Sequence, residues 1–168
     1  MLISSYMENH SETEFVESLG LILQTEGFPR IAGRLLGIFV LRGGPLSFQE
    51  LCEALKVSRG SVSTNTRLLE SLGAVERISV AGERQDYFRL ADTPYERMAA
   101  GQVERAKQAR DRLLKGRDTL ETCDEATFER VTELSEFFGS ISRACAMALD
   151  EMKASRAEAE RPRVVAGE

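Results

Sequence analysis

The stretch that decides the fold is "SFQELCEALKVSRGSVSTNTRLLESLG", residues 47–73. Its apolar residues recur twice at helical spacing, and a brief turn separates the two runs. Ser47 and Glu50 form the S-x-x-E pattern of a capping box at the start of the first run. Ser58 is the candidate N-cap of the second run, and Gly73 is its stop. A short helix, a tight turn and a longer helix are the pattern of a helix-turn-helix.

The second helix opens with "SRGSVSTN", residues 58–65, a run of small polar residues that form helix only moderately well. In a helix-turn-helix, the first residues of the second helix face the base edges, where small side chains allow close approach. With Val62, Thr66 and Leu69 turned inward, the polar residues face outward and Asn65 lies near the border. The candidate DNA-binding residues on this helix are Ser58, Arg59, Gly60, Ser61, Ser63, Thr64, Asn65 and Arg67. The alternative is a serine-rich cap on an ordinary surface helix.

The stretch "AVERISVAGERQDYFRLAD", residues 74–92, changes the period from 3.6 to 2. This alternation predicts two short strands joined through "AGER", with Gly82 giving the turn its freedom. A hairpin directly after a helix-turn-helix is a wing. Arg84 is a further candidate DNA-binding residue, since it lies at the wing tip where a basic side chain reaches the backbone or the minor groove. The alternative is an exposed arginine paired with Glu83 or Asp86.

Helices are also expected on both sides of this winged segment. The helix at 11–26 has an apolar face of Phe15, Leu19, Ile22 and Leu23, and the next helix runs from Pro29 to Arg42. Two long helices follow at 93–122 and about 125–157. In the last helix, apolar residues repeat in alternating steps of three and four, which is a heptad seam typical of a dimer interface. The seam residues are Val131, Leu134, Phe138, Ile141, Cys145, Ala148 and Met152. Packing within one chain is the alternative.

These elements predict a mainly α fold with a small β-wing: a winged helix-turn-helix with long N- and C-terminal dimerisation helices. The expected organisation is a flexible tail at 1–10, helices packing on the winged head at 11–44, the winged helix-turn-helix at 45–92, a two-helix dimerisation region at 93–157 and a flexible tail at 158–168.

Charge locates the expected DNA contact. The 168-residue chain has a net charge of −5, yet residues 28–91 carry nine basic and six acidic residues, whereas residues 1–27 carry five acidic and no basic ones. The basic middle is therefore where DNA would bind.

Other function classes find little support in the sequence. Three separated cysteines and one histidine argue against a disulfide framework, a metal site or a metal cofactor. Cys52 and Cys145 fall on apolar faces, while Cys123 is left open as a redox sensor. We expect no catalytic residues and no enzyme, because no nucleophile grouping, phosphate loop or carboxylate motif is present. The start of the chain has no signal-peptide pattern and no apolar run spans a membrane, so a cytoplasmic protein without membrane contact is expected.

Three stretches together resemble one protein family: "GFPRIAGRLLGIFVL" (27–41), "PLSFQELCEALKVSRGSVSTNTRLLESLGAVERI" (45–78) and "GERQDYF" (82–88). They are similar to the GbsR-type branch of the MarR family of winged-helix transcriptional regulators. The resemblance covers about residues 19–92, and the "GERQDYF" wing departs from the "DRR" wing usual in the broader family. It implies a homodimeric DNA-binding regulator or repressor, with Arg59, Ser61, Ser63, Asn65 and Arg67 in the recognition helix and Arg84 in the wing.

Members of that branch are associated with genes for osmoprotectants such as choline. A site for such a cation would need a cage of aromatic rings. The chain has no Trp, and the candidate rings are equally suited to the core: Phe15, Phe28, Phe39, Tyr95, Phe128, Phe137 and Phe138. The predicted partners are double-stranded DNA and a second copy of the chain, and a small-molecule effector of unknown identity is left open. The alternative function is a winged-helix module that binds protein without specific DNA binding.

Overall fold

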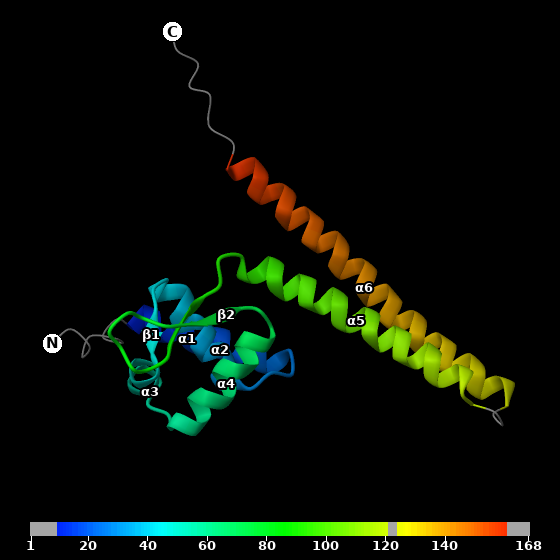
Figure 1. Cartoon of the computed structure of the whole chain (residues 1–168), viewed down its shortest axis with the longest axis horizontal. Coiled ribbons are helices and arrows are strands. Elements are labelled where there is room, and N and C mark those ends of the chain that lie inside the picture. The colour runs from blue at the N-terminus through cyan, green and yellow to red at the C-terminus, as the bar shows by residue number, and fades with distance from the viewer. Residues whose placement is uncertain (1–9, 121–123, 161–168) are drawn as a thin grey trace, which may run out of the picture. The chain divides into compact units, whose positions relative to one another are not determined.

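The computed structural model describes residues 10–120 and 124–160, which form two compact units divided after Tyr95. Each unit is described by itself. Seven helical and strand segments make up the first unit, and the second consists of two long helices (Figure 1). The expected fold class is confirmed: the described chain is mainly helical, with one small antiparallel sheet. The predicted tails fall mostly on residues 1–9 and 161–168, which lie outside the described residues.

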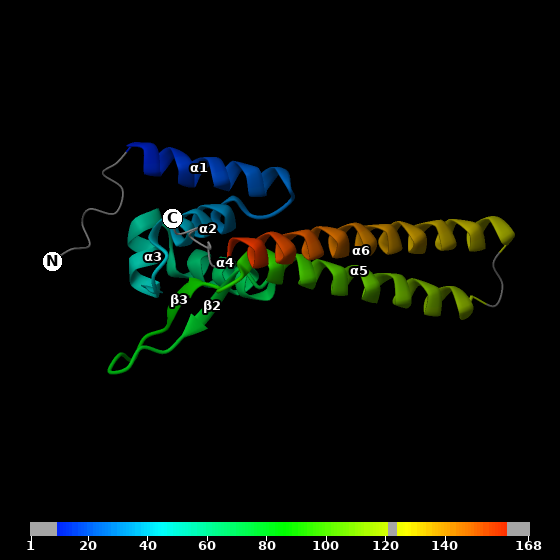
Figure 2. The same ribbon diagram turned by 90° about the horizontal axis from the view of Figure 1, so that it is seen from above.

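The first unit begins with two closely packed helices, α1 (His10–Thr25) and α2 (Arg30–Arg42), which lie side by side in Figure 2. Glycines let the two backbones approach closely. A Cβ added to Gly37 would lie 3.1 Å from the Cα of Val16. The predicted inner face of α1 needs correction. Leu19 and Leu23 are half-buried, but Phe15 and Ile22 are 41% and 56% exposed, and the fully buried positions are Val16 and Gly20. Two faces of α1 are apolar, and the close approach to the glycines of α2 selects the one that carries Val16.

The helix-turn-helix consists of α3 (Phe48–Leu55) and α4 (Arg59–Ser71). The predicted capping box is present: the backbone N–H of Glu50 donates to Ser47 Oγ at 3.2 Å, and the N–H of Ser47 donates to Glu50 Oε2 at 2.7 Å. Lys56 ends α3 in the left-handed conformation, with φ of 53°, which produces the tight turn. Both helices place leucines in the core, where Leu51 and Leu69 are fully buried.

The wing belongs to a sheet of three antiparallel strands in the order β1–β3–β2. The strands are β1 (Leu46–Ser47), β2 (Val75–Ile78) and β3 (Tyr87–Leu90). The predicted hairpin is present, and its second strand has the expected residues, but its first strand ends at Ile78, so that the connection spans residues 79–86 rather than "AGER" alone. The sequence pattern does not predict β1, because a two-residue strand carries no period. It forms by pairing Leu46 and Ser47 with the distant Phe88 and Tyr87.

The second unit is an antiparallel pair of long helices, α5 (Pro94–Asp118) and α6 (Glu125–Ala159) (Figure 1). Asp124 caps α6, as its sequence position predicts. Where α5 begins and α6 ends, the guanidinium of Arg156 donates to the Glu96 carboxylate at 2.7 Å. Across the described parts of the chain, no helix combines the length and the apolar character that crossing a membrane would require.

Candidate nucleic-acid interface

The outward face of α4 carries the polar residues that the sequence places there. Ser58 is the N-cap, and its Oγ accepts a hydrogen bond from the backbone N–H of Ser61 at 3.2 Å. Val62, Thr66 and Leu69 are buried, as the projection predicts. The N-terminal half of α4 therefore presents small and basic residues to solvent. The exposed ones are Ser58, Arg59, Gly60, Thr64 and Arg67, and Ser61 and Ser63 are partly covered.

Asn65 differs from the other candidates, because it is only 6% exposed. Its Nδ2 donates back to the carbonyl of Ser61 at 2.8 Å, one turn earlier in the same helix. Thr66 makes the same kind of bond, since its Oγ1 donates to the Val62 carbonyl at 2.9 Å. Asn65 thus supports α4 from its inner side, and its amide is turned away from the outward face.

The arginines of the wing differ in whether a carboxylate holds them. Arg77 is paired with Asp86 at 2.6 Å, and Arg89 donates through Nε to Glu76 at 2.7 Å. Asp86 therefore pairs with Arg77 of β2 and is not the partner of Arg84. Arg84 is exposed in the loop between the strands, and within residues 10–120 and 124–160 it has no acidic partner.

One contact in the helix-turn-helix was not anticipated from the sequence. The guanidinium carbon of Arg59 lies 5.3 Å from the ring centroid of Phe48, the first residue of α3. Phe48 in turn meets Phe88 of β3 edge to face, with ring centroids 6.1 Å apart. Eleven positions separate Phe48 from Arg59, so no helical or strand period signals that they meet.

The heptad seam of α6 flanks the face that packs most closely against α5. The buried residues of α6 are the small ones, Ser135, Gly139 and Ser142, and the Ser142 hydroxyl donates to the Val103 carbonyl of α5 at 3.4 Å. The seam stays partly uncovered in the single chain, where Leu134 is 46% and Met152 is 40% exposed. The other five seam residues, Val131, Phe138, Ile141, Cys145 and Ala148, are half-buried. The apolar seam is therefore available to a partner.

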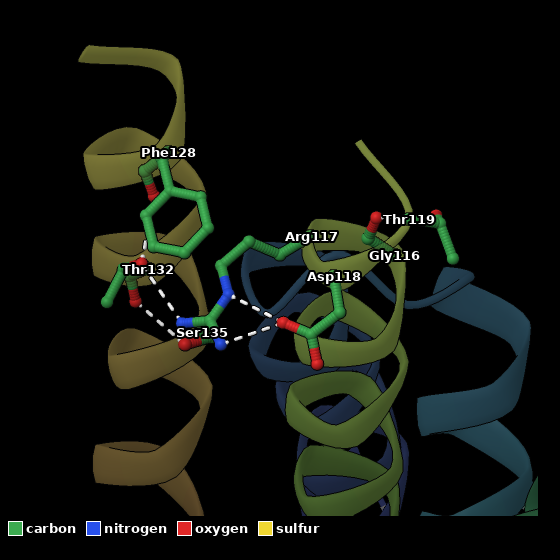
Figure 3. A network of polar contacts seen from close by, with 7 residues as sticks. All are labelled: Gly116, Arg117, Asp118, Thr119, Phe128, Thr132 and Ser135. Carbon is green, nitrogen blue, oxygen red and sulfur yellow. Dashed lines mark hydrogen bonds and ion pairs between the residues drawn. The ribbon is translucent and has the colours of Figure 1, made fainter. Parts of the chain in front are cut away.

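A cluster of polar contacts joins the C-terminal end of α5 to the N-terminal part of α6 (Figure 3). The Arg117 guanidinium lies 4.6 Å from the Phe128 ring centroid and donates to Thr132 Oγ1 at 3.4 Å and to Asp118 Oδ1 at 2.9 Å. An open cavity of about 480 Å³ lies beside it, with Leu113, Leu120 and Val131 among its lining residues. This cluster is one of the contacts that join α5 and α6.

The remaining candidate residues are dispersed. Burial raises the pKa of the Cys52 thiol, and the charge of Arg59 opposes that rise. Cys145 lies on the seam as a free cysteine, and Cys123 lies outside the described residues. Phe39 is fully buried, Phe128 packs under Arg117, and Phe137 meets Phe138 edge to face, so these rings are engaged separately. Within the described residues, no group of three His, Cys, Asp or Glu side chains is placed to hold a metal ion.

Comparison with known proteins points to transcriptional regulators. Residues 26–85 match the MarR family. The chain is 43% identical over 95 residues to "HTH-type transcriptional regulator MmpR5" of Mycobacterium tuberculosis, covering 56% of each chain. It is 28% identical over 87 residues to "HTH-type transcriptional repressor OpcR" of Bacillus subtilis, covering 52% of this chain and 47% of that protein. These matches span about half the length of the curated relatives.

A solved structure agrees over a longer stretch. The crystal structure of a protein described as a transcriptional regulator superposes with a TM-score of 0.77 at 29% identity. The match covers 86% of this chain and 99% of that one. It therefore includes long helices as well as the winged unit.

Proposed function

We propose that this chain is a sequence-specific DNA-binding transcriptional regulator of the MarR family, which residues 26–85 match, and that it acts as a homodimer. Each subunit places α4 in a major groove and the wing loop along the flanking DNA. The observation that carries the proposal is the outward face of α4, where small polar residues surround the exposed Arg59 and Arg67.

The charges of the unit favour DNA over a protein partner. Arg59, Arg67 and Arg84 are exposed, whereas Arg77 and Arg89 are held by carboxylates. Unpaired guanidinium groups suit bidentate contact with phosphate or with guanine. The proposed contacts are Ser58, Arg59, Gly60, Ser61, Ser63, Thr64, Arg67 and Arg84, while Asn65 acts as an internal support of the helix.

The heptad seam of α6 is proposed as the dimer interface. Its residues are apolar and partly uncovered in the single chain, and the fully buried positions of α6 are the small residues beside the seam. A seam with this repeat is the pattern of a left-handed helical pair. A two-fold dimer would present two recognition helices to two half-sites about one helical turn apart.

Four finer assignments complete the proposal. We place the chain in the GbsR-type branch, because "SRGSVSTN" and "GERQDYF" have the form seen there. Repression is the proposed outcome, by occupation of DNA near a promoter. The proposed location is the cytoplasm, and no catalytic activity is assigned. A small-molecule effector stays unassigned, because Phe128 packs with Arg117 and Phe137 packs with Phe138, each pair apart from the other.

The deciding experiment measures fluorescence anisotropy of a labelled duplex from the DNA upstream of the gene for this chain. A scrambled duplex is the control, and both are titrated at two salt concentrations. Phosphate contacts predict that the logarithm of the affinity falls steeply with the logarithm of the salt concentration. Tight, selective and salt-sensitive binding supports the regulator. Weak and equal binding to both duplexes would favour the protein-interaction module instead.

A further inference from the structure

We propose that Phe48 is a positioning residue for Arg59, whose guanidinium it holds at the start of α4 in the orientation needed for DNA contact. This inference rests on the function proposed above, since it concerns how one residue of that interface is prepared before DNA arrives. Phe48 itself is not assigned any contact with DNA.

The contact between the two side chains has the geometry of a cation–π interaction. The guanidinium carbon of Arg59 lies 5.3 Å from the Phe48 ring centroid, within the ~6 Å over which such pairs attract. Arg59 is the first residue of α4 and Phe48 is the first residue of α3. The contact therefore spans the turn of the helix-turn-helix and joins the first turns of its two helices.

The Phe48 ring is itself held in place. It packs edge to face on Phe88, which is 4% exposed and pairs with Leu46 across the β1–β3 ladder. Its backbone follows directly on the capping box of Ser47 and Glu50. Because strand, cap and ring are all constrained, a guanidinium that packs on this ring is constrained as well.

The electrostatics of α3 agree with this position of the guanidinium. Burial raises the pKa of the Cys52 thiol, and the positive charge of Arg59 lowers it. Cys52 lies four positions after Phe48, on the same face of α3. The charge thus lies over the face of α3 that carries both residues.

This arrangement has a consequence for binding. A long arginine side chain has many rotamers, and fixing it against DNA costs entropy. A ring that fixes Arg59 beforehand reduces that cost. Arg67 is eight positions further along α4 and serves as the comparison residue, because it is exposed and lies two helical turns from Arg59.

The test is a double-mutant cycle on DNA affinity, measured by anisotropy with the upstream duplex. Phe48→Leu is expected to weaken binding roughly three- to tenfold, the range that a cation–π contact of this kind supports. In an Arg59→Ala background the same change is expected to have an effect below about twofold. In an Arg67→Ala background it keeps its full effect. Phe48→Tyr retains a ring and is expected to bind like the wild type.

A second measurement follows the contact without DNA. The Nε–Hε resonance of Arg59 is expected to show an upfield ring-current shift that Phe48→Leu removes and Phe48→Tyr preserves. An equal loss of affinity for Phe48→Leu in the Arg59→Ala background would overturn the positioning role, since it would mean a general effect on folding. Unchanged affinity in the single variant would overturn it too. If the wild type binds no duplex, the proposed function fails and the positioning role with it, whereas the ring-current shift still shows whether the contact exists.

Discussion

Gly33 of α2 lies so close to Leu19 of α1 that a Cβ added to Gly33 would stand 2.4 Å from the Leu19 carbonyl oxygen. It would also stand 2.8 Å from the Cα of Gly20. Both neighbours are backbone atoms, so no side chain can rotate to make room. The absence of a side chain at Gly33 allows the backbones of α1 and α2 to approach this closely.

Gly33→Ala is therefore expected to destabilise the protein by about 1–3 kcal/mol or more, the usual cost of forcing extra atoms into a packed interior. Thermal unfolding followed by circular dichroism measures the change. Gly60→Ala is the matched control, because a Cβ there would meet only Ser58 Oγ at 3.9 Å. That control should be neutral or stabilising by up to ~1 kcal/mol, as for Gly to Ala in a helix. A Gly33→Ala protein as stable as the wild type would contradict the close packing.

Arg67→Ala is expected to weaken DNA binding by about 1–3 kcal/mol without lowering the melting temperature. The reason is that Arg67 is exposed on α4 and supports no part of the core. Anisotropy on the upstream duplex gives the affinity. Arg130→Ala removes the same charge from α6 and should leave the affinity unchanged. Equal affinity of Arg67→Ala and wild type would remove this face of α4 from the groove.

Ile141→Asp is expected to convert the dimer into a monomer, because it places a charge in the middle of the apolar seam. Sedimentation velocity measures the oligomeric state. Met147→Asp introduces the same charge on α6 at a residue that is 66% exposed and outside the seam, so that variant should stay dimeric. A dimeric Ile141→Asp variant would show that the seam is not the interface between subunits.

The start of α6 is expected to respond to acid through Asp124. Hydrogen bonds from Thr127, including its N–H at 2.7 Å, hold the pKa of the Asp124 carboxyl below its ordinary value of 3.8. A lowered pKa in the folded state means that the ionised cap stabilises the helix above the ordinary pKa. That stabilisation is lost as the pH falls through the lower, folded value.

An NMR titration of the Asp124 carboxyl carbon measures this pKa directly. Asp124→Asn keeps a good N-cap that does not titrate, so its α6 should lose the acid response while remaining helical at neutral pH. A titration midpoint at or above 3.8 would contradict the capping contact.

Local patterns in the sequence determined the helix-turn-helix. The capping box at Ser47, the cap at Ser58 and the inward positions Val62, Thr66 and Leu69 all depend on residues within four positions of one another. The same holds for the cap of α6 at Asp124 and for the spacing of its apolar seam. Such signals need no knowledge of the rest of the chain, which is why the fold class and the outward face of α4 could be predicted.

Only the tertiary structure decided the contacts between residues far apart in the chain, including which apolar face of α1 is buried. It turned α1 onto Val16 rather than Phe15, with Gly33 and Gly37 of α2 lying close against the backbone of α1 at Leu19, Gly20 and Val16. It also formed β1 by pairing with β3, and it set Arg59 on Phe48. These contacts join residues far apart in the chain, where packing rather than period determines the partner.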